Sequence, residues 1–200
     1  LLSARLNYFN LKRYDTAEKY FNILALIATQ QENKAEAIKG LLRCQYKNKK
    51  WSDCAKIATQ ILQDKSAATD DILMANMALY HNSISNKDTS GALQLLTKVI
   101  KNNSSLFTAE AHSLLAKLYF DEGKLALAEK TAFEVIQKQA SYEYWVTKTY
   151  LLLGDIYTAQ KDNFNAIATF KSISENATIE EFKLEAAEKL KTLTDNSNLK

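Results

Sequence analysis

The fold is decided by two stretches, AEAHSLLAKLYFDEGKLALAEKTAFEVI (residues 109–136) and YLLLGDIYTAQKDNFNAIATFKSI (residues 150–173). The second repeats the first at an offset of 38 residues. Self-similarity at a fixed period of this length is the mark of a helical repeat array in which each unit is a pair of helices.

A small residue marks the same place in each of five units. These residues are Ala17, Cys54, Ala92, Ala128 and Ala166, spaced 37, 38, 36 and 38 residues apart. Apolar side chains, most of them larger, follow four and seven residues later: Phe21 and Leu24, Ala58 and Ile61, Leu96 and Val99, Ala132 and Val135, Phe170 and Ile173. Such spacing places all three on one face of a helix. We expect five antiparallel helical hairpins whose helices approach closely at the small residue.

The composition agrees with an all-α protein. The chain has no proline and four glycines, the two residue types that interrupt helices. No alternation typical of strands is sustained, and no run of 18 apolar residues suggests a membrane span. No leader segment is visible at the first residue, and we expect the chain to be a fragment or a processed form.

We therefore predict a single domain over residues 1–200. Its repeats are expected at about 1–30, 34–64, 69–102, 106–139 and 142–175, with a capping helix at 179–193. Asp88 or Thr89 can cap a helix, Gly123 can end one in a left-handed conformation, and Thr178 with Glu181 forms a capping-box pattern.

The sequence offers little for catalysis or metal binding. His112 falls among inward-facing places and is expected to be packed and hydrogen-bonded, and His81 has no ligand partner at a suitable spacing. Cys44 and Cys54 are too few for a zinc site, and we expect buried free thiols, with a disulfide bridge as the alternative. No phosphate-binding loop or nucleophile motif occurs, so we predict no enzyme, no cofactor and no metal.

The charge is mild, at +3 from 26 basic and 23 acidic residues. Lys47, Lys49 and Lys50 form the one tight basic cluster, and it falls in an expected turn. A nucleic-acid binder usually shows a concentrated basic stripe, so we expect no nucleic acid.

The pattern resembles the tetratricopeptide repeat (TPR) family. In the fourth unit the signature places are held by Leu115, Ala116, Tyr119, Gly123, Ala128 and Val135. In the fifth they are held by Leu153, Gly154, Tyr157, Ala166, Phe170 and Ile173. In the first they are held by Tyr8, Tyr14, Ala17 and Phe21. The period exceeds the family's usual 34, the closing proline is missing, and Asn163 stands where a turn aromatic is expected. The resemblance implies an all-α, right-handed α-α superhelix of about five hairpins plus a C-terminal capping helix.

In such solenoids the first helix of each pair lines the concave surface, as the resemblance implies. The groove-facing places are Glu36, Lys39, Arg43 and Tyr46; Glu110, Ser113, Lys117 and Phe120; and Lys148, Leu151, Asp155 and Thr158. From these we take Lys39, Arg43, Tyr46, Lys117, Phe120 and Asp155 as candidate peptide-binding residues, since Arg and aromatic side chains often dominate interfaces. The carboxylate clamp of some family members does not fit, because Arg43 stands where Asn is required.

The favoured function is a non-catalytic scaffold that binds a peptide or partner helix in its concave groove. The alternatives are a structural segment of a larger repeat array in a bacterial cell-envelope protein and a nucleic-acid-binding helical repeat protein. Because long-period, proline-poor arrays are similar to bacterial cell-envelope repeat proteins, we expect the periplasm or envelope rather than the cytoplasm. The partner and the oligomeric state stay open.

Overall fold

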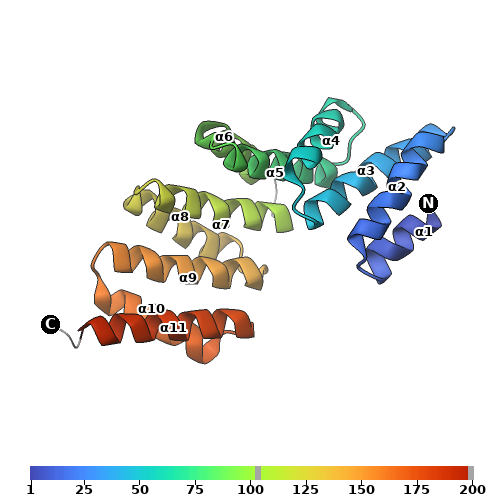
Figure 1. Cartoon of the computed structure of the whole chain (residues 1–200). Coiled ribbons are helices and arrows are strands. Elements are labelled where there is room, and N and C mark those ends of the chain that lie inside the picture. Colours follow the sequence, from blue (N-terminus) through green and yellow to red (C-terminus); the bar gives the residue numbers. More distant parts are fainter. Residues whose placement is uncertain (102–104, 198–200) are drawn as a thin grey trace. The chain divides into compact units, whose positions relative to one another are not determined.

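The computed structural model describes residues 1–101 and 105–197, in which all regular elements are helices (Figure 1). The prediction of an all-α fold is confirmed. The described chain divides into two compact units, Leu1–Val99 and Ile100–Lys200. The expected end of the third repeat at residue 102 lies outside the described residues.

The first unit is a succession of helices in which α2, α3, α4 and α5 each pack on the α-helix before them. The elements are α1 (Leu2–Arg5), the π-helical turn η1 (Leu6–Asn10), α2 (Tyr14–Ile27), α3 (Gln31–Lys47), α4 (Trp51–Gln63), α5 (Thr69–Ser85) and α6 (Thr89–Ile100). The first repeat differs from expectation, because its first helix is a four-residue α-helix that widens into η1 instead of one continuous helix.

The second unit has two layers (Figure 1). It consists of α7 (Leu106–Asp121), α8 (Leu125–Lys138), α9 (Glu143–Ala159), α10 (Asn163–Asn176) and α11 (Glu180–Ser197). Helices α7, α9 and α11 lie side by side in one layer, and α8 and α10 form the other. This arrangement brings the first helices of successive hairpins onto a common face.

The repeated small residues lie where the helices meet. Ala17, Cys54, Ala92, Ala128 and Ala166 have no exposed surface. Of the ten residues predicted to share their faces, all are buried except Leu24, which is half-buried. In the second unit, Ala116, Ala128 and Ala132 form one cluster with Leu152 and Ile156, which joins three helices into a continuous core. The predicted seam is therefore the packing surface of the structure.

Two phenylalanines pack where a glycine leaves room. A Cβ atom added to Gly154 of α9 would lie closer than 3.0 Å to the ring of Phe170 on α10, and one added to Gly40 of α3 would meet Phe21 of α2 equally closely. Both rings are almost fully buried. The missing side chain thus allows a large ring to lie directly against the facing helix.

Each hairpin turn contains one residue in the left-handed region. These residues are Lys12, Lys49, Lys87, Gly123 and Lys161, with φ of 53°, 56°, 61°, 71° and 65°. Gly123 adopts the conformation that the sequence predicted. At the other four turns a lysine occupies a conformation that glycine adopts without a steric penalty.

Side-chain caps fix several helix starts. The Asp88 carboxylate accepts a hydrogen bond of 2.9 Å from the Gly91 amide, as predicted, and Asp162 accepts one of 3.1 Å from the Asn165 amide. The predicted capping box is wrong, because the Thr178 hydroxyl donates to Glu143 and the helix begins after Ile179, whose carbonyl accepts from the Lys183 amide. Thr178 therefore ties the segment before α11 to α9 and does not cap α11.

The Gly154–Phe170 contact yields a stability prediction. We expect Gly154→Ala to lower the free energy of unfolding by about 1–3 kcal/mol, because the ring must shift in a packed core. This loss outweighs the gain of about 1 kcal/mol that alanine brings to a helix interior. Urea denaturation of Gly154→Ala, Phe170→Leu and the double variant measures the coupling. Strictly additive losses would contradict a direct contact.

The turn lysines yield a second prediction with opposite sign. Lys161→Gly is expected to raise the free energy of unfolding by about 0.5–1 kcal/mol, because glycine relieves the left-handed strain that an L side chain carries. The same substitution at exposed Lys171, inside α10, should lower it by about 1 kcal/mol. Thermal unfolding of both variants tests the assignment, and a destabilised Lys161→Gly would refute it.

Candidate functional site

A groove runs across the first helices of the second unit. It is a cavity of about 330 Å³ between α7, α9 and α11. Its lining residues are Ser113, Leu114, Lys117, Tyr144, Lys148, Leu151, Leu152, Asp155, Glu181, Phe182 and Glu185. Five of these come from the groove-facing places that the sequence predicted for the fourth and fifth repeats, and three come from the capping helix.

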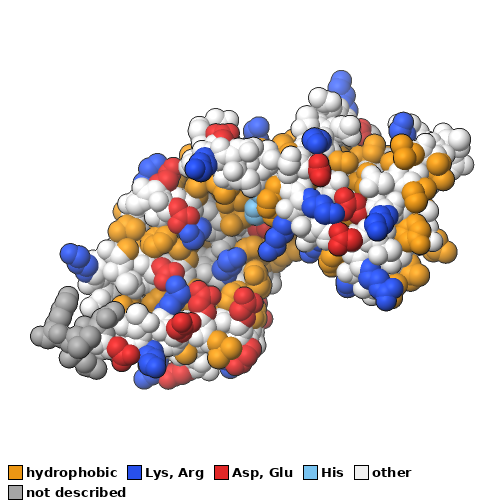
Figure 2. Space-filling view, viewed as in Figure 1, with side chains coloured by type: hydrophobic (Ala, Val, Ile, Leu, Met, Phe, Trp, Pro, Cys, Tyr) orange, Lys and Arg blue, Asp and Glu red, His pale blue; other side chains and the backbone are white. Residues whose placement is uncertain are grey.

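The groove combines an apolar floor with charged walls. Leu151, Leu152 and Phe182 are buried beneath it. Tyr144 lies against Phe182, with ring centroids 5.1 Å apart. Figure 2 shows acidic side chains gathered over α11 and its boundary with α9, with lysines among them. Such a surface offers both apolar contact and charge selection to a partner.

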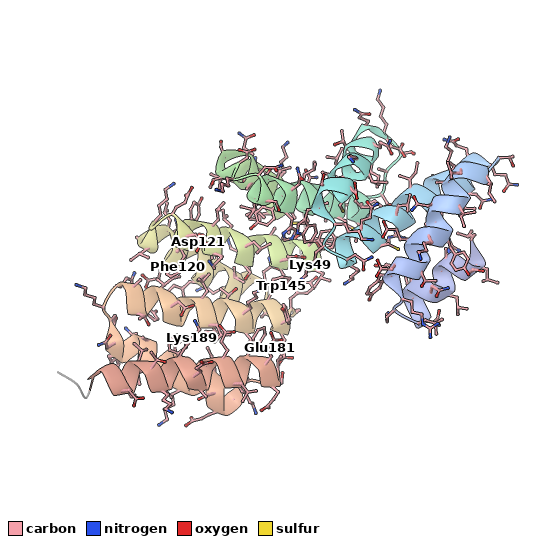
Figure 3. The ribbon with its side chains drawn as sticks, viewed as in Figure 1. Lys49, Phe120, Asp121, Trp145, Glu181 and Lys189 are labelled. Carbon is pink, nitrogen blue, oxygen red and sulfur yellow. The ribbon has the colours of Figure 1, made fainter. Side chains whose placement is uncertain are left out.

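Two of the candidate charges are paired within the protein. Lys189 Nζ of α11 donates to both carboxylate oxygens of Asp155 on α9, at 2.7 and 2.9 Å, and lies 3.7 Å from Glu185. Figure 3 shows Lys189 between the two helices. Lys117 pairs with Asp121 one turn later in α7 and lies 5.7 Å from the half-buried Phe120 ring. Because these side chains are paired within the protein, fewer unpaired charges are available to a partner at the groove than the sequence alone suggests.

Lys148 and Glu181 make no ion pair within the described residues. Lys148 Nζ lies over the rings of Trp145 and Tyr144, 5.1 and 5.8 Å from their centroids. Burial raises the pKa of Tyr144, and the nearby negative charges of Glu181 and Glu110 raise it further. The aromatic rings hold Lys148 in place, whereas the Glu181 carboxylate stands open to an incoming cation.

One buried contact that fixes the groove has no signal in the sequence pattern. Thr149 of α9 is fully buried, and its hydroxyl forms a 2.9 Å hydrogen bond with the Ser113 hydroxyl of α7. Its hydroxyl also lies 2.7 Å from the Trp145 carbonyl. This bond sets the register of the two helices that form the groove floor.

The three candidates in the first unit lie in internal contacts. The buried carboxylate of Asp71 on α5 pairs with Lys39 and Arg43 of α3, each at 3.0 Å. Tyr46 lies 5.4 Å from the Trp51 ring, and its hydroxyl is 3.4 Å from His81 Nε2. The structure brings these residues together, but it gives each a structural partner that spacing alone did not reveal.

The basic cluster at the second turn is also engaged. Lys50 pairs with Glu18 at 2.8 Å and with Asp15 at 3.1 Å. The hydrogen bonds to Glu18 and Asp15 raise its pKa. Lys49 occupies the left-handed turn position. These lysines thus hold α4 to α2 and shape the turn.

The histidines and cysteines occupy structural places. His112 is buried, with Nδ1 3.4 Å from Gln139 Nε2, as a packed histidine should be. His81 stacks on Trp51, with centroids 4.1 Å apart. Both cysteines are free and buried, and burial raises the pKa of each thiol to about 12. No cluster suited to hold a metal ion occurs among residues 1–101 and 105–197.

A second hollow, of about 450 Å³, lies along α9 and α10. It is lined mostly by small uncharged side chains such as Ser172 and Asn176, together with Tyr150 and Tyr157. We favour the groove of α7, α9 and α11, because three helices contribute to it and charges of both signs surround its apolar floor. In the described part of the chain no helix has the length and apolarity needed to cross a bilayer.

Comparison with known proteins shows the fold. No family model matches the sequence, and no curated protein matches it. The crystal structure of BtubC (BKLC) from P. vanneervenii matches with a TM-score of 0.67 at 14% identity, covering 94% of this chain and 83% of that one. TTC0263, a thermophilic TPR protein in Thermus thermophilus, matches with a TM-score of 0.61 at 17% identity, covering 92% of this chain and 94% of that one.

This chain has a TPR fold. The predicted resemblance and the α-α solenoid architecture are confirmed by this likeness and by the consecutive packing of helices. At identities of 14% and 17% the likeness concerns the fold alone and transfers no binding site.

His112 yields a prediction on pH. Burial lowers the pKa of His112 in the folded state. Below about pH 6.5, His112 therefore binds a proton more readily in the unfolded chain than in the folded chain. Its contribution to stability is therefore present above about pH 6.5 and is lost as the pH falls below that value. We expect His112→Gln to shrink the fall in unfolding free energy between about pH 7.5 and pH 5, measured by urea denaturation. An unchanged difference between the two pH values would refute this role.

Proposed function

We propose that this chain is a non-catalytic protein-interaction scaffold and that the groove of α7, α9 and α11 binds a peptide or a partner helix. The proposal is carried by the cavity of about 330 Å³, which joins an apolar floor to charged walls. A groove between helices with a few placed polar groups is a common binding surface for an amphipathic segment.

The charges of the groove favour a cationic partner segment. Asp155 is neutralised by Lys189 and Lys117 by Asp121, so these four groups offer little net charge. Glu181 and Glu185 remain on the wall formed by α11; Glu185 lies 3.7 Å from Lys189, whereas Glu181 has no ion-pair partner in the described chain. Lys148, the unpaired cation that also lines the groove, is held over the rings of Trp145 and Tyr144. A Lys or Arg of the partner would meet this wall while a large apolar side chain enters the floor beside Phe182.

The candidate residues then divide by role. Lys117 and Asp155 line the groove, and Phe120 lies one turn beyond Lys117 on the same helix. Lys39, Arg43 and Tyr46 are proposed as a separate surface of the first unit. There a partner would have to compete with Asp71 for the two cations, so we expect that surface to contribute less.

Selection of peptides against the folded chain tests the proposal. We expect peptides selected from a displayed random library to carry Lys or Arg close to a large apolar residue. For a labelled peptide of this kind, Glu181→Lys should raise the Kd by at least about tenfold, or about 1.4 kcal/mol, measured by fluorescence polarisation. Glu180→Lys is the matched control, because it makes the same charge change one residue away on α11 without lining the groove.

Equal effects of the two substitutions would refute the groove as the binding site. Selected peptides without a cationic preference would refute the role of the acidic wall. The nucleic-acid alternative is tested with a labelled single-stranded oligonucleotide. Affinity for it that falls steeply between about 50 and 200 mM salt would favour that alternative over a peptide scaffold.

A further inference from the structure

The cavity of about 450 Å³ between α9 and α10 is large enough for a small molecule. The two helices belong to different layers of the second unit (Figure 1). We call it the α9–α10 cavity, and its lining residues are Thr147, Tyr150, Leu153, Tyr157, Asn165, Ala168, Thr169, Ser172, Ile173, Asn176 and Ala177. None of these residues lines the groove of α7, α9 and α11. The cavity is therefore a separate candidate site.

The preceding hairpin shows why this cavity is open. By the offset of 38 residues, Tyr150 and Ala177 hold the places of His112 and Gln139. In the fourth hairpin those two side chains are buried, with Gln139 Nε2 3.4 Å from His112 Nδ1. In the fifth hairpin the short side chain of Ala177 cannot reach across, and Tyr150 is 38% exposed. The place that a glutamine fills in one hairpin thus opens onto a cavity in the next.

The wall that α10 contributes is also particular to this hairpin. Four uncharged residues with hydrogen-bonding side chains follow one another at i, i+4, i+7 and i+11, which is one side of a helix: Asn165, Thr169, Ser172 and Asn176. By the repeat spacing, the equivalent places of the fourth repeat are held by Leu127, Thr131, Glu134 and Lys138, and those of the second by Asp53, Ile57, Gln60 and Asp64. An uncharged polar wall is therefore not a requirement of the repeat.

Helix α9 supplies the opposite wall. Tyr150 and Tyr157 lie two turns apart on it, about 10 Å along the helix axis. Leu153 and Ile173 are buried and form the apolar part of the lining. Five hydroxyl groups of the lining make no hydrogen bond to another atom of the described residues, namely those of Thr147, Tyr150, Tyr157, Thr169 and Ser172. These groups are available to a ligand.

The charged groups closest to the cavity are engaged with protein groups outside it. Burial raises the pKa of Tyr157, and the negative charges of Glu129 and Asp162 raise it further, so both carboxylates lie near this end of the cavity. Glu129 accepts a 2.7 Å hydrogen bond from Gln160, and Asp162 caps the start of α10. Neither carboxylate lines the cavity.

A lining without charge selects against ionic ligands. Lys171 and Glu175 of α10 lie 3.9 Å from each other, and neither belongs to the lining. A charged ligand group would lose its hydration here without gaining a counterion, which is costly. Hydroxyl and amide groups both donate and accept hydrogen bonds, so a ligand that uses them carries donors and acceptors alike.

A saccharide meets these demands. It consists largely of hydroxyl groups, and the apolar face of a sugar ring can lie against a tyrosine ring, whose body is apolar and whose tip is polar. A polypeptide also carries donors and acceptors, but a cavity of this volume encloses a small ligand and not a length of chain with its side chains.

We propose that the α9–α10 cavity binds a neutral saccharide, with a sugar ring against Tyr150 and its hydroxyl groups paired with the side chains of both walls. The proposal does not rest on the proposed function of the groove. Because the two sites share no lining residue, either can fail without the other.

Titration of the full chain with neutral disaccharides of glucose, galactose, mannose and N-acetylglucosamine, followed by NMR of the isotope-labelled protein, tests the proposal. We expect at least one disaccharide to bind with a Kd of about 1 mM or lower. The same disaccharide with a carboxylate or an amine on one ring should bind at least about tenfold more weakly.

Two variants locate the binding. Ala177→Gln introduces the side chain that closes the equivalent place of the fourth hairpin, and Tyr150→Ala removes the ring, so each should raise the Kd at least about tenfold. Ala159→Gln makes the first change at an exposed residue of α9 outside the lining. Tyr20→Ala makes the second at a tyrosine of the first unit that is 43% exposed. Both controls should leave the Kd unchanged, and thermal unfolding verifies that all four variants fold.

A panel in which no neutral disaccharide binds below about 10 mM would overturn the proposal. Binding that survives both cavity variants, or that the controls weaken equally, would overturn it by placing the saccharide elsewhere. An uncharged peptide rich in Ser and Asn provides the last comparison. If the peptide binds and loses affinity in Ala177→Gln while the saccharides do not bind, the cavity belongs to a polypeptide and the proposal is wrong.

Discussion

The structure depends on close approach of helices at places where the side chain is small. Alanine or cysteine at the five seam positions is fully buried, and the glycines at 40 and 154 admit a phenylalanine ring directly onto the facing helix. Because packed interiors have almost no free volume, the distance between helices is set by these residues and not by the larger ones around them. The side chains at four and seven residues further on, most of them larger, then fill the space that remains.

This constraint explains why the groove forms on one face of the second unit. If each hairpin closes at the same small residue and turns through one left-handed residue, its first helix always emerges on the same side. Helices α7, α9 and α11 are therefore brought together as a layer, and hydrogen bonds such as Thr149 to Ser113 fix their register. The repeat supplies the groove, while residues that are not repeated decide what it can bind.

The repeated part of the structure was predictable from the sequence, and the unrepeated part was not. The seam residues, the turn at Gly123 and the cap at Asp88 follow from spacing and local backbone chemistry, which the sequence states directly. The pairing of Asp71 with Lys39 and Arg43, and of Asp155 with Lys189, depends on the register between helices that are not adjacent in the chain. No periodicity encodes that register. The same reason accounts for the wrong prediction at Thr178, whose hydroxyl donates to Glu143, 35 residues away, and does not cap the helix that follows it.

The last helix shows how a structural element acquires a second role. The sequence predicted α11 only as a capping helix, and no residue of it was among the candidates for binding. In the structure Phe182 and Ala186 bury its inner side, while Glu181 and Glu185 form a wall of the groove. The inner side of α11 therefore serves the packing of the array, while the carboxylates beside it set the charge that the groove presents.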